Sequence, residues 1–160
     1  MTLILTVRGM PQIYYGDEIG MLGNKDKHGD GDIRRDFPGG WQGDTQSAFT
    51  KEGRTKIEEE YHAFTKKLLT WRKDKSVIHT GKTIQFVPEN NVYVYFRTND
   101  KETVMVAINN NPKSQTIDLD RFKEVLKNYN KGKDILTDKE MNLKEKLTIE
   151  GKKSMVIELN

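Results

Sequence analysis

Asp30 and Arg34 stand four residues apart in a glycine-rich stretch near the start of the chain. A carboxylate accepts hydrogen bonds and a guanidinium group donates them, and an ion pair between the two holds both in place. Such a pair could bind a polar ligand. The alternative is a solvated ion pair in a polar loop, which is the commoner outcome when only the spacing is known.

Other acidic residues flank this pair. Asp17 and Glu18 are candidates for acid–base chemistry by residue type alone. The spacing of Asp26, Asp30 and Asp32 suggests calcium, but it does not match the Asp-x-Asp-x-Asp-Gly loop with its closing Glu. We therefore expect no metal site, and we expect His28, a lone histidine beside these acids, to be a surface residue.

The composition excludes several classes of protein. The 160 residues carry 27 Lys and Arg against 24 Asp and Glu, spread along the chain, so we expect no nucleic-acid partner. The absence of cysteine excludes disulfides and cysteine-based metal sites. No apolar run approaches the ~20 residues of a membrane span, so no membrane partner is expected. The first residues lack the features of a signal peptide, and the compartment, cytoplasm or bacterial periplasm, stays open.

The first part of the chain has two short apolar runs followed by a long irregular stretch. Residues 2–7, TLILTV, are too few to distinguish a buried strand from a buried helix. A short β-rich run follows at residues 11–15, and residues 20–53 then lack any period, which is typical of a functional or disordered loop. Ile33, Phe37 and Trp41 argue against disorder because they offer apolar anchors.

Residues 55–73 are predicted to form a helix. Thr55 and Glu58 form a capping box at its start. Apolar residues recur three and four positions apart and define one face: Ile57, Tyr61, Phe64, Leu68 and Trp71.

Short β-rich runs separated by turns follow Lys75 and predict an antiparallel sandwich. The runs are 82–87, 92–98, 103–110, 114–119, 131–136, 146–149 and 154–159, with a helical turn or two at 120–128. The domain boundary is placed near Lys75, which gives domains of 1–75 and 76–160. Four side chains could form a ligand-binding strip on the sandwich, although such residues usually pack across strands: Tyr93, Tyr95, Arg97 and Tyr129.

Residues 9–18, GMPQIYYGDE, closely resemble the eighth-strand segment of the α-amylase family, glycoside hydrolase family 13. Residues 30–34 and 36–41 are most similar to its neopullulanase and cyclomaltodextrinase group. The family fold is a (β/α)₈ TIM barrel followed by a C-terminal β-sandwich. The resemblance implies that residues 2–7 end the seventh barrel helix, residues 13–15 form the eighth strand and residues 55–73 the eighth helix.

The resemblance also implies an activity for a larger protein. The family cleaves α-1,4-glucosidic bonds of maltooligosaccharides, cyclodextrins or pullulan by a retaining mechanism that uses two carboxyl groups ~5 Å apart. The family's catalytic residues come from strands four, five and seven, so none is expected here, and the 160 residues alone are expected to be inactive. No organic cofactor is implied, and calcium in the whole protein finds no support here.

Individual roles follow from the same resemblance. Asp30 and Arg34 would contact the sugar on the non-reducing side of the cleavage point. Trp41 would stack on a sugar ring or pin the loop, and Phe37 would more often pin it. Three residues are assigned structural roles at the end of the barrel strand: Tyr15, Asp17 and Glu18.

Two other functions remain as alternatives, a carbohydrate-binding module and an interaction domain without sugar binding. We also expect the 160 residues to self-associate, because a single barrel strand has both hydrogen-bonding edges unpaired.

Overall fold

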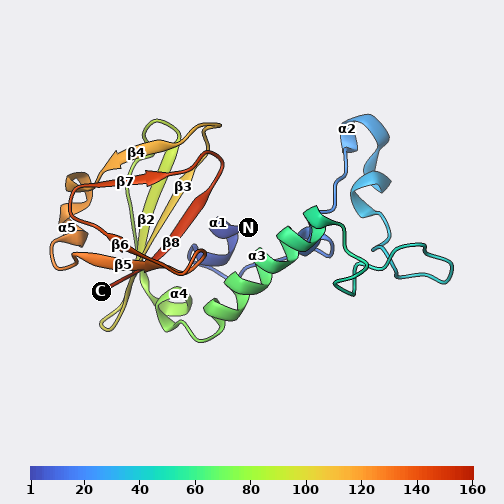
Figure 1. Cartoon of the computed structure of the whole chain (residues 1–160), viewed down its shortest axis with the longest axis horizontal. Helices are drawn as coiled ribbons and strands as arrows, with labels where there is room; N and C mark the ends of the chain where they lie inside the picture. The colour runs from blue at the N-terminus through green and yellow to red at the C-terminus, as the bar shows by residue number, and fades with distance from the viewer. The chain divides into compact units, whose positions relative to one another are not determined.

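A computed structural model describes all residues from 1 to 160 (Figure 1). The chain divides into two compact units. The first joins Met1–Met10 to Leu68–Asn160, and the second is Pro11–Lys67. The helix α3 (Lys56–Lys73) runs through the point of division. None of the helices combines the length and the apolar character that a bilayer span requires.

The second unit is mostly loop, as the lack of a period predicts. It contains three short helical turns, η1 (Asp17–Ile19), α2 (Lys25–His28) and η2 (Asp30–Arg34). The prediction of a strand at residues 13–15 is wrong, because these residues form no strand. A strand needs a neighbour with which to exchange backbone hydrogen bonds, and nothing in the unit pairs with this segment.

The predicted helix at 55–73 is confirmed by α3. Its capping box forms as expected. The Thr55 hydroxyl accepts from the Glu58 N–H at 3.3 Å, and the Glu58 carboxylate accepts from the Thr55 N–H at 2.7 Å. The apolar face is covered only in its later part, since Leu68 is fully buried whereas Ile57 and Tyr61 remain 65% and 51% exposed.

The first unit contains the predicted antiparallel sandwich (Figure 1). A six-stranded sheet has the order β1-β2-β3-β8-β5-β6, and β4 and β7 form a second sheet of two strands. The strands are β1 (Lys82–Gln85), β2 (Val92–Thr98), β3 (Thr103–Asn109), β4 (Gln115–Asp118), β5 (Lys131–Asp134), β6 (Lys139–Asn142), β7 (Lys146–Ile149) and β8 (Ser154–Leu159). We refer to residues 82–159 as the β domain. Of its strands, only β6 lacks a counterpart in the sequence-based expectation.

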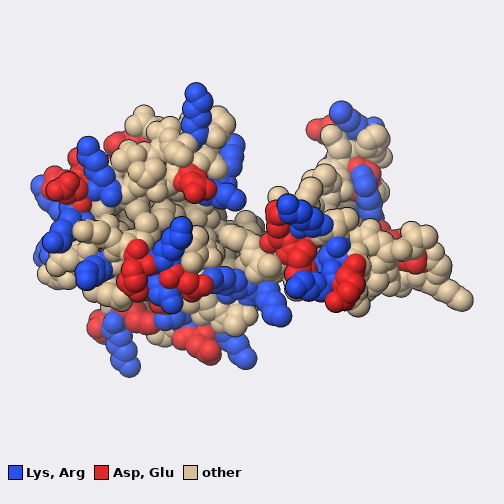
Figure 2. All heavy atoms as spheres, viewed as in Figure 1, with Lys and Arg blue, Asp and Glu red and all other residues tan.

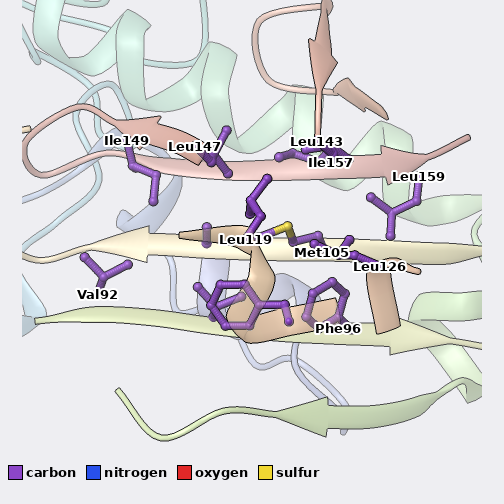
Figure 3. Packing of buried hydrophobic residues seen from close by; sticks show 13 residues of the cluster. Val92, Phe96, Met105, Leu119, Leu126, Leu143, Leu147, Ile149, Ile157 and Leu159 are labelled. Atoms are coloured by element: carbon purple, nitrogen blue, oxygen red, sulfur yellow. The ribbon is translucent and has the colours of Figure 1, made fainter. Parts of the chain in front are cut away.

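The main hydrophobic core lies on one face of the larger sheet. Alternate residues of β2, β3 and β8 supply one side of it, and the other side comes from β7 and from the helical turns η3 (Leu119–Phe122) and α5 (Lys123–Leu126), which confirm the helical turn expected at 120–128. Figure 3 shows these side chains pointing toward one another, with Leu119 and Leu147 among them.

The opposite face of the larger sheet is also buried, beneath α1 (Thr2–Thr6) and α4 (Ser76–Thr80). Tyr95 and Arg97 point to this face and are fully buried. The hypothesis of a ligand-binding strip through Tyr93, Tyr95, Arg97 and Tyr129 is therefore wrong, because its two central side chains cannot reach a ligand. The alternation along β2 correctly predicts that the strand has two different faces. It cannot predict that both faces are buried, because α1 and α4, which cover the second face, lie elsewhere in the sequence.

The end of α3 is attached to β8 by a partly buried acid, Glu158. The Glu158 carboxylate accepts from the Trp71 indole N–H at 2.7 Å and pairs with the Lys75 ammonium at 2.5 Å. Burial by itself would raise the pKa of Glu158, but the hydrogen bonds from Lys75 and Trp71 outweigh it, and the pKa is lowered. The charged pair thus helps to fix the helix on the sheet.

Candidate functional site

The predicted pair of Asp30 and Arg34 forms in the structure. Both residues lie in η2, and the Arg34 guanidinium contacts one carboxylate oxygen of Asp30. The other oxygen lies 3.1 Å from the Lys25 ammonium. The side chains are 44% exposed for Asp30 and 60% for Arg34, so each keeps hydrogen-bonding capacity that faces solvent. The two cations around Asp30 fix where its carboxylate points.

A second ion pair, which the sequence reasoning missed, holds the same turn in place. The Asp32 carboxylate accepts from the Asn24 N–H at 2.6 Å and from the Arg35 guanidinium at 2.8 Å. The Asn24 N–H, followed by the charge and hydrogen bond of Arg35, lowers the pKa of Asp32. The three-residue spacing of Asp32 and Arg35 was the available signal for it.

The backbone around η2 is closely packed. A Cβ atom placed on Gly23 would lie 2.5 Å from the carbonyl oxygen of Asp32, so only glycine allows the two segments to approach this closely. Together with the Asp32 hydrogen bonds, this contact makes the segment that carries Asp30 and Arg34 an ordered structure in a unit with few regular elements.

The two aromatic residues of the loop differ in exposure. Phe37 is half-buried and packs on Phe49, with ring centroids 4.7 Å apart, which supports its expected role of pinning the loop. Trp41 is 67% exposed. Its backbone is held by Asp44, whose carboxylate accepts from the N–H groups of Gly39 at 2.8 Å and of Trp41 at 3.2 Å. The indole ring is therefore presented to solvent on a fixed turn.

Asp17 and Glu18 hold their own turn. The Asp17 carboxylate accepts from the Tyr14 N–H at 3.0 Å, and that of Glu18 accepts from the Gly16 N–H at 2.8 Å. Tyr15 precedes this turn, and its ring stacks at a tilt on Tyr14 with centroids 4.5 Å apart. Each carboxylate has thus a local backbone partner, and the two do not form a pair facing a common ligand position.

Metal-binding geometry is absent from the chain as a whole. Nowhere do three His, Asp or Glu side chains gather as a group that could hold an ion. Asp30 and Asp32 are each committed to arginine, and His28 is an exposed residue at the end of α2. The chemistry available at this loop is hydrogen bonding and ring stacking.

Comparison with known proteins places the β domain in a described family. Residues 83–158 match the cyclo-malto-dextrinase C-terminal domain. The cyclomaltodextrin glucanotransferase of Niallia circulans is 35% identical over 111 residues, which are 69% of this chain and 13% of that enzyme. The cyclomaltodextrinase of Geobacillus thermopakistaniensis is 32% identical over 107 residues, which are 66% of this chain and 15% of that enzyme. The chain therefore spans a small fraction of its curated relatives.

Solved structures share the fold over almost the whole chain. An α-amylase from Anoxybacillus aligns with a TM-score of 0.73 at 22% identity, covering 99% of this chain and 30% of the other. The α-amylase of Geobacillus thermoleovorans in complex with acarbose aligns with a TM-score of 0.70 at 22% identity, covering 99% and 32%. Residues 83–158 are therefore a C-terminal domain of the α-amylase family of glycoside hydrolases, like those of cyclomaltodextrinases and maltogenic amylases.

Proposed function

We propose that these 160 residues are the C-terminal part of a retaining α-glucan hydrolase that cleaves α-1,4 bonds in maltooligosaccharides, cyclodextrins or pullulan. The observation that carries the proposal is the match of residues 83–158 to the cyclo-malto-dextrinase C-terminal domain. The resemblance of residues 9–18 to the eighth-strand segment of the family supports it from the other end of the chain.

The loop of the second unit would contribute to substrate binding. Asp30 would accept hydrogen bonds from sugar hydroxyls, Arg34 would donate them, and Trp41 would stack on a ring. Their support is geometric, because all three side chains are exposed while the backbone that carries them is fixed by Asp32 and Asp44. Tyr15, Asp17 and Glu18 would keep a structural role through their hydrogen bonds within the turn.

The domain assignment is part of the same proposal. Residues 1–75 would be the last unit of a (β/α)₈ barrel and residues 76–160 the closing sandwich. Apolar side chains left uncovered on two helices support it, since Leu3 and Ile4 of α1 are 44% and 45% exposed and Ile57 of α3 is 65% exposed. Such residues are covered when more protein packs against them.

Kinetics of the whole enzyme test this function. Arg34→Ala should reduce kcat/KM for maltooligosaccharides by about 10- to 100-fold, because one charge-assisted hydrogen bond to the substrate is lost. Hydrolysis should still occur, since the catalytic carboxylates are untouched. The measurement is initial-rate kinetics on substrates longer than three glucose units.

A matched control separates binding from charge. Lys27→Ala removes a positive charge from the same loop, where the lysine side chain is exposed and has no ion-pair partner, and it should leave kcat/KM unchanged. Equal kinetics for Arg34→Ala and the unaltered enzyme would show that the pair with Asp30 only braces the loop. No hydrolysis of any α-glucan by the whole protein would refute the proposed function itself.

A further inference from the structure

A groove of about 230 Å³ opens in the β domain between the β1–β2 connection, β4 and η3. The half-buried side chain of Ile117 forms the accessible part of an apolar floor, beneath which lie Val92, Val94 and Phe122. The rim is polar and consists of Glu89, Asn90, Gln115, Asp118 and Arg121. Sites for drug-sized ligands have volumes of roughly 300–1,000 Å³, so this groove suits a smaller molecule.

Two amide groups on the rim are free to bind a ligand. The side chains of Asn90 and Gln115 make no hydrogen bond within the chain. Each amide offers two donors and one acceptor. The Asp118 carboxylate uses one oxygen to accept from the Asp120 N–H at 2.9 Å, which leaves the other oxygen available. The rim can therefore both donate to and accept from hydroxyl groups.

One of these amides stands on a rigid turn. Asn90 and Asn91 both have positive φ, 50° and 54°, in a two-residue turn whose ends are joined by the Val92 N–H and the Glu89 carbonyl at 2.8 Å. The Asn111 side chain also donates to the Asn90 carbonyl at 2.7 Å. A ligand that binds Asn90 thus does not have to order its backbone first.

The charges of the groove disfavour an anionic ligand. The Arg121 guanidinium is paired with Glu89 at 2.8 Å and donates to the Val87 carbonyl at 2.6 Å. Asp118 remains as an unpaired negative charge. On the face of the molecule drawn in Figure 2, acidic and basic side chains are interspersed, so no broad positive patch is seen there. A phosphate or carboxylate would meet net negative charge at this rim.

We propose that this groove binds one pyranose ring of a neutral saccharide. The apolar face of the ring would lie on Ile117 and the apolar floor behind it, and its hydroxyl groups would bind Asn90, Gln115 and Asp118. Amides and a carboxylate around an apolar floor match a molecule that has hydroxyls on its edge and C–H groups on its face. The choice of glucose as this ring, at the end of an α-glucan, rests on the proposed function.

The test is a titration of the isotope-labelled 160-residue chain with maltose, followed by backbone amide NMR. We expect shifts of Asn90, Gln115 and their neighbours with a Kd in the roughly millimolar range, because one ring buries little surface. Gln115→Ala and Asn90→Gly should each weaken binding at least about fivefold. Both changes leave the fold intact, since Gln115 has no partner to lose and glycine favours the positive φ of Asn90.

The control is Asn128→Ala, which removes an exposed amide of the same domain that does not line the groove and should leave the Kd unchanged. Absence of shifts at the groove with maltose at roughly 50 mM, well above the expected Kd, would overturn the proposal. So would equal binding of sorbitol, which has hydroxyl groups but no ring face, or an unchanged Kd in both groove variants.

The outcome is separable from that of the proposed function. The groove is probed by shifts at residues 89–122 and by its own variants, whereas the substrate loop is probed by the Arg34→Ala kinetics. Maltose binding that persists in Arg34→Ala but is lost in Gln115→Ala would assign it to the groove. If the whole enzyme failed to hydrolyse glucans, the proposed function would be refuted, but saturable binding of maltose at the groove would still support the groove proposal.

Discussion

Arg97 is a cation buried without a carboxylate. Its guanidinium donates to the carbonyl of Thr6 at 3.3 Å and to that of Gly81 at 2.8 Å, and its Nε has no partner. These carbonyls lie at the C-terminal ends of α1 and α4, where the helix dipole carries partial negative charge. Burial lowers the pKa of Arg97, and the helix ends partly compensate for the charge. This residue thus fixes both helices on the sheet.

Tyr95 lies beside Arg97 and makes the stability of the first unit sensitive to pH in the alkaline range. Its hydroxyl lies 2.5 Å from that of Thr6, which in turn donates to the Thr2 carbonyl at 2.7 Å. Burial raises the pKa of Tyr95 to about 12, from 10.0 for an exposed tyrosine. The folded chain therefore keeps this proton at pH values where the unfolded chain has released it. As the pH rises from about 10 to about 12, the free energy of unfolding should therefore decrease, by up to about 1.4 kcal/mol per pH unit.

Urea unfolding at several pH values from 9 to 12 measures this loss. Tyr95→Phe should be less stable at neutral pH, because the Thr6 hydroxyl loses one of its two hydrogen bonds, but its stability should decline less steeply above pH 10. Tyr93→Phe, at a half-buried position whose hydroxyl bonds Gln85, is the matched control and should keep the steep decline. Identical alkaline slopes for Tyr95→Phe and the unaltered chain would contradict the assignment.

At the scale of elements, one side chain joins the ends of several strands. Asn109 closes β3, and it is 1% exposed. Its amide nitrogen lies 3.0 Å from three backbone carbonyls, those of Lys113, Ile149 and Glu150. Its amide oxygen accepts from the Asn111 N–H at 2.9 Å. The β3–β4 connection is thereby tied to the β7–β8 connection.

Asn109→Ala should therefore lower the free energy of unfolding by about 2–4 kcal/mol, since buried carbonyls would lose their donor. Asn109→Asp should be comparably destabilised, because a carboxylate cannot donate to them. Asn110→Ala, on the exposed neighbouring residue, should change stability by less than about 1 kcal/mol. Urea denaturation followed by circular dichroism provides the measurement, and equal midpoints for the 109 and 110 variants would refute this role.

The elements differ in how well the sequence predicts them. Helix α3 and strands β2, β3 and β8 are found because their patterns are long and regular. The strand β6 is missed because KEMN shows no β-rich alternation, and α4 is missed because it is five residues long and contains the β-branched pair Val77 and Ile78. The short run at 2–7 is compatible with a strand or a helix by its sequence alone. In the structure it is the helix α1, which packs on the sheet, and such packing supplies most of the stability of short helices.

The candidate site shows a similar contrast. The pair of Asp30 and Arg34 is predictable because four residues bring two side chains together on one helical turn. The groove of the β domain is not, because its rim joins residues 89–90 to residues 115–121. Only the packing of the two-stranded sheet against the larger sheet brings those segments together. Whether Asp30, Arg34 and Trp41 touch a sugar stays a prediction.

At the scale of the whole molecule, the 160 residues alone should not hydrolyse glucans. A retaining mechanism needs a nucleophilic carboxylate and an acid across the scissile bond, and Asp17 and Glu18 are instead bonded to their own turn. The measurement is release of reducing sugar from pullulan and maltoheptaose by the purified chain. Activity that persists in Asp17→Asn with Glu18→Gln would reveal a catalytic site elsewhere in these residues.

The chain should also self-associate. Leu3, Ile4, Tyr14 and Tyr15 are 44–49% exposed, and exposed apolar side chains recruit partners. A symmetric dimer that buries them is the simplest arrangement. Light scattering of the chain at micromolar concentrations should give a mass above 18.5 kDa. A monomer of 18.5 kDa at these concentrations would exclude association.

The contacts of α1 make the first unit a discontinuous domain. Residues 11–67 are an insert between two segments that fold together, and Thr2, Thr6, Tyr95 and Ser154 join these segments by side-chain hydrogen bonds. A protease nick in the loop at 20–53 would therefore leave the N-terminal peptide bound without a covalent link. Loss of that peptide would expose Arg97 to solvent and uncover one face of the sheet.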